Sequence, residues 1–365
     1  MCSSPLNKNV VFQHKCSAAQ DQLISDNIKK LLEQEVIQMS PYEAGQIISP
    51  IFLREKSDGS HRLILNLKNL NKDVVKHRFK METFHSILNL VQKDCFMSSI
   101  DLKSAYYSVP IADDHSKFLK FTFKGVTYKF VVLPNGYTQG PRKFTKLCRV
   151  PIASLRTRGH IVAIYIDDIF ITASTFELCL HSVFEVIKIF DDLGFYIHFD
   201  KSVLTPTTVL TVLGFVINSV LMTVTLTDEK KSNTIAFCKT ILRRELSTIR
   251  QVASLLGKLT STFPAVQYGP LHYRHLERDK YNALLQCKGN FDSKMKLSRE
   301  AREDLKWWIH TLPNCSKRID NGKITDTIYS DASDFAWGAV YKNQSTGGAW
   351  LPNELDFHIN SKVCQ

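Results

Sequence analysis

The sequence has 365 residues and is 44% hydrophobic, so it can bury a large core and divide into two or three domains. Its formal net charge of +12 indicates a polyanionic partner, above all nucleic acid, with an ordinary basic soluble protein as the alternative. The nine cysteines are scattered and odd in number, which argues against both a zinc site of the CxxC type and a disulfide framework. We therefore expect a reduced, intracellular protein, cytoplasmic or nuclear.

No association with a membrane is expected. Met1 is followed by polar residues instead of a basic and then apolar signal segment. Residues 203–227 are uncharged and long enough to span a bilayer, but threonines, Pro206 and Gly214 interrupt them. We predict strands over 209–217 and 220–226 instead, joined by an Asn-Ser turn.

The remaining elements follow from periodicity and turn residues. The first half of the chain is expected to contain a helix over 20–38, a hairpin of strands 51–53 and 63–65, a strand over 96–100 that ends in Asp101, and a hairpin of strands 120–123 and 126–132. Helices are expected over 141–157 and 176–193, the second closed by Gly194. The chain becomes helical beyond Asp228, and strands return near Ile324. Thr248 and Gln251 form a capping box for a helix to about Thr260.

Two adjacent aspartates, Asp167 and Asp168, interrupt the apolar run 161–171. Each carboxylate costs several kcal/mol to desolvate without a partner, and a divalent cation would remove that cost. We place the pair at the tip of a strand–turn–strand. If the strand that ends in Asp101 lies beside it, three carboxylates converge, enough to hold two Mg²⁺ ions bridged by substrate phosphates. Alternatively, Asp101 is only a turn or cap residue.

Five blocks in this order resemble those of reverse transcriptases. They are KSDGSHRLILNL from Lys56, SIDLKSAY from Ser99, LPNGYTQGP from Leu133, YIDD from Tyr165, and the LGF, KS and LGF segments that begin at Leu193, Lys201 and Leu213. Further pieces are similar to retrotransposon polymerases of the DIRS type: HRLILNLKNLN from His61, GPLHYR from Gly269, Trp307-Trp308 and SDAS from Ser330.

The resemblance implies an α+β right-hand polymerase fold, with fingers, a palm that carries an antiparallel sheet and a helical thumb, followed by a partial RNase H-like α/β domain. The expected domains are an N-terminal helical extension (1–45), fingers and palm (46–227), thumb and connection (228–320) and a truncated RNase H-like domain (321–365).

The implied function is RNA-directed DNA synthesis by a retrotransposon enzyme, in which nucleotides from dNTPs are transferred to the 3′-hydroxyl of a DNA primer on an RNA template. Asp101, Asp167 and Asp168 would be the catalytic residues and the ligands of two Mg²⁺ ions, with Mn²⁺ as a possible substitute. Two alternatives are a catalytically silent nucleic-acid-binding remnant of a retroelement and an unrelated two-metal enzyme such as a nuclease or cyclase. The oligomeric state is open.

The resemblance also assigns the residues that bind the nucleotide. Lys56 and Arg62 would hold its phosphates, and the Leu102 carbonyl would be a further metal ligand. Tyr106 would lie under the sugar and exclude a ribose 2′-hydroxyl. Lys201 would protonate or shield the pyrophosphate. Asn135, where many relatives have Phe, would bond the sugar or the template. The alternatives are that Lys56 and Arg62 lie on an ordinary solvated hairpin tip, that Tyr106 is a core tyrosine, and that Lys201 forms a salt bridge near Asp200.

Asp331 resembles the first metal ligand of an RNase H domain. The glutamate and the later aspartates of that site are missing from the 365 residues, so we expect the RNase H part to be incomplete and inactive.

Overall fold

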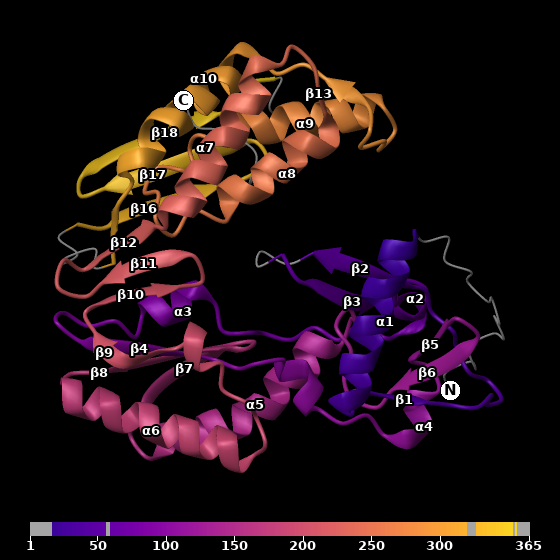
Figure 1. The fold of residues 1–365 in the computed structure, drawn as a ribbon. Coiled ribbons are helices and arrows are strands. Elements are labelled where there is room, and N and C mark those ends of the chain that lie inside the picture. Colours follow the sequence, from indigo (N-terminus) through magenta and orange to yellow (C-terminus); the bar gives the residue numbers. More distant parts are fainter. Residues whose placement is uncertain (1–16, 56–58, 320–325, 353–354, 356–365) are drawn as a thin grey trace. The chain divides into compact units, whose positions relative to one another are not determined.

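The computed structural model describes residues 17–55, 59–319, 326–352 and 355, which form two compact units that divide after Ile319 (Figure 1). The first unit contains three hydrophobic cores. No helix in the described part of the chain is both long and apolar enough to cross a membrane.

The first core lies between a helix and two small antiparallel sheets, β1-β6-β5 and β2-β3. Its surrounding elements are α1 (Ala18–Glu33), β1 (Ile37–Met39), β2 (Ile51–Glu55), β3 (His61–Leu65), α2 (Leu70–Asp73), α4 (Asp113–Ser116), β5 (Lys120–Phe123) and β6 (Val126–Phe130). The helix expected over 20–38 is wrong at its end, because Glu35 turns the chain with φ 54° and Ile37 then pairs with Phe130. The two hairpins occur where they were predicted.

A buried lysine ties β5 to the segment that follows β1. The side chain of Lys120 is 0% exposed, and its Nζ lies 2.7 Å from Glu43 Oε1. It also donates to Pro41 O at 2.9 Å and to Gln46 Oε1 at 3.0 Å. Three oxygens thus replace the water that the ammonium loses on burial.

The second core belongs to a four-stranded antiparallel sheet of order β7-β8-β4-β9. The strands are β4 (Phe96–Asp101), β7 (Ile161–Tyr165), β8 (Asp168–Ala173) and β9 (Val203–Thr207), and the helices are α5 (Gly140–Thr157) and α6 (Phe176–Asp192), with short 3-10 turns η1 (Ala105–Ser108) and η2 (Phe199–Lys201). The helices α5 and α6 pack on one face of the sheet (Figure 1), where Ile169 and Ile171 are buried. Phe170, between them, faces the other way into the third core.

The third core joins a second sheet, β10-β11-β12-β15, to a group of helices. Its elements are α3 (Phe84–Leu88), β10 (Val209–Val212), β11 (Phe215–Asn218), β12 (Thr223–Leu226), α7 (Asp228–Arg243), β13 (Ser247–Thr248), α8 (Ile249–Thr260), α9 (Arg274–Gln286), β14 (Lys294–Met295), α10 (Arg299–Thr311), η3 (Leu312–Asn314) and β15 (Lys317–Arg318). The predicted capping box of Thr248 and Gln251 is confirmed at the start of α8.

The expected Asn-Ser turn and the strand after it are confirmed, but the single strand expected over 209–217 is wrong, because that segment forms two strands, β10 and β11. Leu213 and Gly214 both have positive φ, 51° and 76°, and reverse the chain between β10 and β11. Two successive residues of positive φ are the mark of a tight hairpin turn. The Asn218 side chain accepts from Leu221 N–H at 2.8 Å in the next turn, before β12.

The described residues of the second unit form three antiparallel strands, β16 (Ile328–Ala332), β17 (Ala336–Tyr341) and β18 (Gln344–Ala349). The strands expected near Ile324 are therefore present, and Asp331 lies on the first of them, opposite Gly338.

We predict that Glu43→Ala lowers the free energy of unfolding by about 2 kcal/mol, because it leaves the Lys120 ammonium buried with neutral partners only. The Lys120 hydrogen bond lowers the pKa of Glu43 below 4.5. The stabilisation by ionised Glu43 is therefore complete above pH 4.5 and is lost as the pH falls below it. The difference in free energy of unfolding between variant and wild type should narrow in acid.

Urea unfolding at pH 7 and pH 4 measures both effects. The control is Glu33→Ala, which deletes one partner of an exposed pair, 4.0 Å from Lys29, and is expected to cost less than about 0.5 kcal/mol. Equal losses in the two variants would contradict the prediction.

Candidate active site

The turn between β7 and β8 carries the aspartate pair. Tyr165 pairs with Asp168, which leaves Ile166 and Asp167 as a two-residue turn, as the sequence predicted. Ile166 has φ 58°, a left-handed conformation that is rare for a β-branched residue and costs on the order of 1–3 kcal/mol. Surrounding contacts must therefore hold this turn in place.

The strand β4 brings Asp101 to the same turn. In the antiparallel register of β4 and β8, Asp101 lies directly opposite Asp168. One residue further, the Leu102 N–H donates to Asp167 O at 2.9 Å. The adjacency of these strands, which the sequence could only suggest, places all three aspartates at one end of the sheet.

The electrostatics of this group are unfavourable without a cation. Burial, together with the neighbouring charges of Asp167 and Asp101, raises the pKa of Asp168 to about 6. Burial also raises the pKa of Asp101, and Asp167 adds to that effect. Lys201 opposes the shift at both residues.

The donor chemistry fits a hard divalent ion, because carboxylate oxygens are the ligands that Mg²⁺ prefers and their mutual repulsion would be relieved by its charge. In the described part of the chain, however, no set of three or more His, Cys, Asp or Glu side chains already encloses a metal-sized position. Asp167 lies close enough to raise the pKa of both Asp101 and Asp168.

The segment before β9 fixes Asp101 from its other side. His198 N–H donates to Asp101 O at 2.8 Å, and Asp101 N–H donates to Ser202 Oγ at 3.0 Å. Lys201 lies between these two anchors in η2, which explains why its charge acts on Asp101. Lys201 was expected from the sequence, whereas His198 and Ser202 were not, because both bond the backbone of Asp101.

Tyr106 faces the aspartates from η1. Its ring packs edge-on against Phe144 of α5 at 5.3 Å between centroids. Burial, with smaller contributions from the charges of Asp167 and Tyr165, raises the pKa of Tyr106 to about 12. The hydroxyl therefore stays protonated beside the carboxylates.

Tyr107, the next residue, joins two predicted residues that are far apart in sequence. Burial raises the pKa of Tyr107 overall, although a hydrogen bond with the Asn135 side chain and the charge of Arg62 partly oppose the rise. Asn71 holds the loop of Asn135: its Nδ2 donates to Gly136 O at 2.8 Å and its Oδ1 accepts from Thr138 N–H at 2.9 Å. Sequence analysis missed Tyr107 because its pattern does not differ from that of a core tyrosine.

Arg62 lies on β3 directly opposite Arg54 of β2, and both are exposed. Like charges in opposed positions destabilise a sheet, and a bound anion would relieve the repulsion. Lys56, at the tip of the same hairpin, lies outside the described residues. Asp331 lies in the second unit, where its Oδ1 accepts from Ala332 N–H at 2.8 Å.

We predict that Asp168→Asn raises the free energy of unfolding of the metal-free protein at pH 8 by about 2 kcal/mol. The folded-state pKa of about 6 lies above the usual 3.8, so folding disfavours the charged form, and the substitution removes that charge. The gain should disappear as the pH falls through 6 and below 4. Urea unfolding in a chelator tests this, with exposed Asp26→Asn expected within about 0.5 kcal/mol of wild type. An unchanged or lower stability for Asp168→Asn at pH 8 would contradict it.

Known proteins share both the sequence pattern and the fold. Residues 54–217, just under half of the chain, match the family model described as "Reverse transcriptase (RNA-dependent DNA polymerase)". The Pro-Pol polyprotein of Simian foamy virus type 1 is 24% identical over 246 residues, which are 67% of this chain and 20% of the relative. The Gag-Pro-Pol polyprotein of Sheep pulmonary adenomatosis virus is 28% identical over 187 residues, which are 48% of this chain and 10% of the relative.

A solved structure of the foamy viral protease-reverse transcriptase dRH in complex with double-stranded DNA has a TM-score of 0.73 and 22% identity, and covers 99% of this chain and 61% of that chain. The chain thus spans a fifth or less of these polyproteins, and its mixed helix-and-sheet fold is that of the polymerase in the foamy viral structure. Residues 54–217 thus match the reverse transcriptase family model, and retroviral and retroelement polyproteins are similar to this chain.

Proposed function

We propose that this chain is an RNA-directed DNA polymerase that transfers nucleotides from dNTPs to a primer 3′-hydroxyl. The observation that carries the proposal is the register of β4 and β8, which sets Asp101 opposite Asp168 with Asp167 in the adjoining turn. A foamy viral relative has been solved in complex with an RNA/DNA hybrid, which supports an RNA template and a DNA primer as the partners here.

Asp101, Asp167 and Asp168 would hold two Mg²⁺ ions, with Mn²⁺ as a possible substitute. Bound there, the ions would activate the primer hydroxyl and neutralise the triphosphate. The raised pKa of Asp168 supports this role, since an environment that disfavours a bare carboxylate favours one bound to a cation. The Leu102 carbonyl is proposed as a further ligand, since its residue directly follows Asp101.

The phosphates of the nucleotide would be held by Arg62, with Lys56 from the same hairpin. The opposed Arg54 suggests that it takes part as well, because the two guanidinium groups lie on neighbouring strands. Lys201 lies close enough to Asp101 for its charge to oppose the rise in the pKa of that carboxyl. It would protonate or shield the leaving pyrophosphate.

The sugar would lie between two consecutive tyrosines and the loop of Asn135. Tyr106, beside Asp167, would clash with a ribose 2′-hydroxyl. Asn135 would reach the sugar or the template strand from its place beside Tyr107.

The wider assignments are proposals of the same kind. The motifs at His61, Gly269, Trp307 and Ser330 suggest an intracellular retrotransposon enzyme of the DIRS type, nuclear or cytoplasmic. We retain fingers and palm over 46–227, a thumb over 228–320 and an RNase H-like unit from 321, after a helical extension.

We predict that the double substitution Asp167→Asn/Asp168→Asn lowers primer extension on an RNA template by at least about 10³-fold, because it removes two charges that would hold the metal ions. Extension with dNTPs and Mg²⁺ is measured together with the Kd for template–primer, which should change little. Asp26→Asn is the control for loss of a carboxylate. No extension by wild type, with tight template binding, would favour the silent remnant instead.

We also predict that Tyr106→Ala raises the preference for ribonucleotides. The ratio of kcat/KM for rNTP to that for dNTP should rise by about 10-fold or more, because the substitution removes the ring that opposes the 2′-hydroxyl. Tyr106→Phe keeps the ring and should change the ratio by less than about threefold. An unchanged ratio in Tyr106→Ala would assign the ring to core packing alone.

A further inference from the structure

The strand that leads into the aspartate turn is an edge strand. In the sheet of order β7-β8-β4-β9, β7 pairs with β8 on one side only. The backbone groups on its other side therefore need partners from outside the sheet. Two side chains that sequence analysis overlooked, Glu82 and Arg156, supply them.

Glu82 and Arg156 bond to this edge as a neighbouring strand would. Glu82 Oε2 accepts from Ile164 N–H at 2.8 Å. Arg156 donates to Val162 O from Nε at 2.9 Å and from Nη2 at 2.7 Å. Arg156 Nη2 also donates to Glu82 Oε1, which joins the two side chains in an ion pair. The pair thus offers the edge an acceptor and a donor at once.

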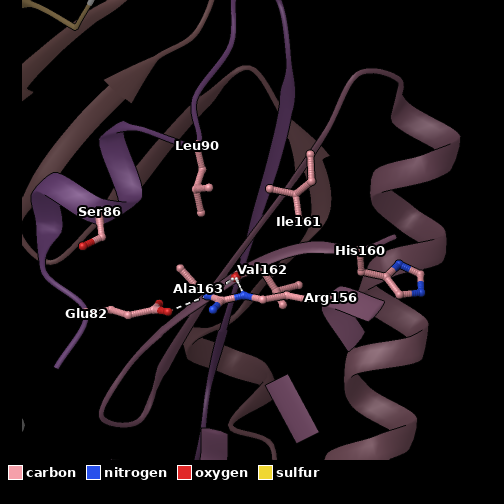
Figure 2. Close-up of a pocket in the computed structure, with 8 residues that line it drawn as sticks. All are labelled: Glu82, Ser86, Leu90, Arg156, His160, Ile161, Val162 and Ala163. Carbon is pink, nitrogen blue, oxygen red and sulfur yellow. Dashed lines mark hydrogen bonds and ion pairs between the residues drawn. The ribbon is translucent and has the colours of Figure 1, made fainter. Parts of the chain in front are cut away.

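The two residues come from separate elements that pack around β7. Arg156 lies in the last turn of α5, and Glu82 precedes α3, whose N-cap is Thr83. Figure 2 shows them at the wall of a cavity of about 350 Å³, which Leu90, Ile161 and Ala163 also line. The ion pair is thus a polar connection at this wall between the end of α5 and the segment before α3.

The position of these contacts along β7 connects them to the chemistry. Ile164 immediately precedes Tyr165, and the left-handed Ile166 and the aspartates follow. The turn is held on one side by β8 and by the Leu102 N–H. On the other side, the last backbone group fixed before the turn is Ile164 N–H. A strand that shifts here would carry Asp167 and Asp168 with it.

We propose that Glu82 and Arg156 are positioning residues for the polymerase reaction, which hold the outer edge of β7 so that the strained turn keeps Asp167 and Asp168 opposite Asp101. The inference rests on the proposed polymerase function. Neither residue touches the reacting groups in this scheme. A displacement of about 1 Å at a catalytic group can lower a rate on the order of 100-fold, so the effect of losing the pair should be large.

The chain contains a matched control for this pair. Arg158 and Glu185 form an ion pair at 2.8 Å whose side chains are 45% and 26% exposed, against 45% and 27% for Arg156 and Glu82. Arg158 is the C-cap of α5, and Glu185 lies on α6. The described hydrogen bonds of the Arg158 side chain reach Ser154 and Glu185, not β7. Losing this pair should therefore leave the turn in place.

The test compares Glu82→Gln, Arg156→Lys and their combination with Arg158→Lys and Glu185→Gln. We expect kcat for primer extension to fall by about 10-fold to 100-fold in the first set, with KM for dNTP and Kd for template–primer within about threefold of wild type. The kcat of the double variant should be no lower than that of the more impaired single variant, because both residues act through one connection. The control variants should keep kcat within about twofold of wild type.

Amide hydrogen exchange over residues 161–173 provides a second measurement that needs no activity. It should be at least about 10-fold faster in the Glu82 and Arg156 variants than in the controls, because Ile164 N–H loses its acceptor or the acceptor loses its support. Equal kcat in test and control variants, or equal exchange, would overturn the positioning role. If wild type does not extend a primer, the proposed function fails, and exchange alone then decides whether the pair holds the turn.

Discussion

The register between β4 and β8 is the constraint on which the candidate site depends. It sets Asp101 against Asp168 at the end of a sheet whose interior is apolar, so three carboxylates share a partly buried position. Such a group weakens the fold unless a cation joins it, because burial and like charge both oppose ionisation. Hydrogen bonds from the surrounding structure oppose this repulsion: β8, the Leu102 N–H and the 196–202 segment each bond the backbone near the carboxylates.

The turn η1 connects this group to a second one. Tyr106 packs with the core of α5 and α6, whereas Tyr107 packs with the core of β2, β3, β5 and β6. Two successive side chains can enter different cores because a 3-10 turn has about three residues per turn, so neighbouring side chains point in different directions. One peptide bond therefore joins Tyr106, near Asp167, to Tyr107, near Asn135 and Arg62.

Elements defined by local pattern were predicted well, and those defined by distant pairing were not. The hairpin around Lys124-Gly125, the capped helix α8 and the Gly194 cap of α6 all follow from residues within a few positions of one another. The region 209–217 did not, because uniform β-propensity does not show where a chain reverses, and a Leu-Gly turn is a weaker signal than Asn-Ser. Likewise, Ile37–Met39 continues an apolar helical pattern and becomes a strand only because β6 offers an edge.

For the site, local sequence was enough to suggest metal chemistry: two aspartates in an apolar run, a third at a strand end and an arginine near a hairpin tip stand out because those residue types are costly or unusual in such places. The groups that hold these residues became visible only in the packed fold. Glu82 meets Ile164 across 82 residues, and Tyr107 meets Asn135 through a loop that Asn71 secures. These contacts join a side chain to a distant partner, often to a backbone group that every residue carries, so no local pattern can announce them.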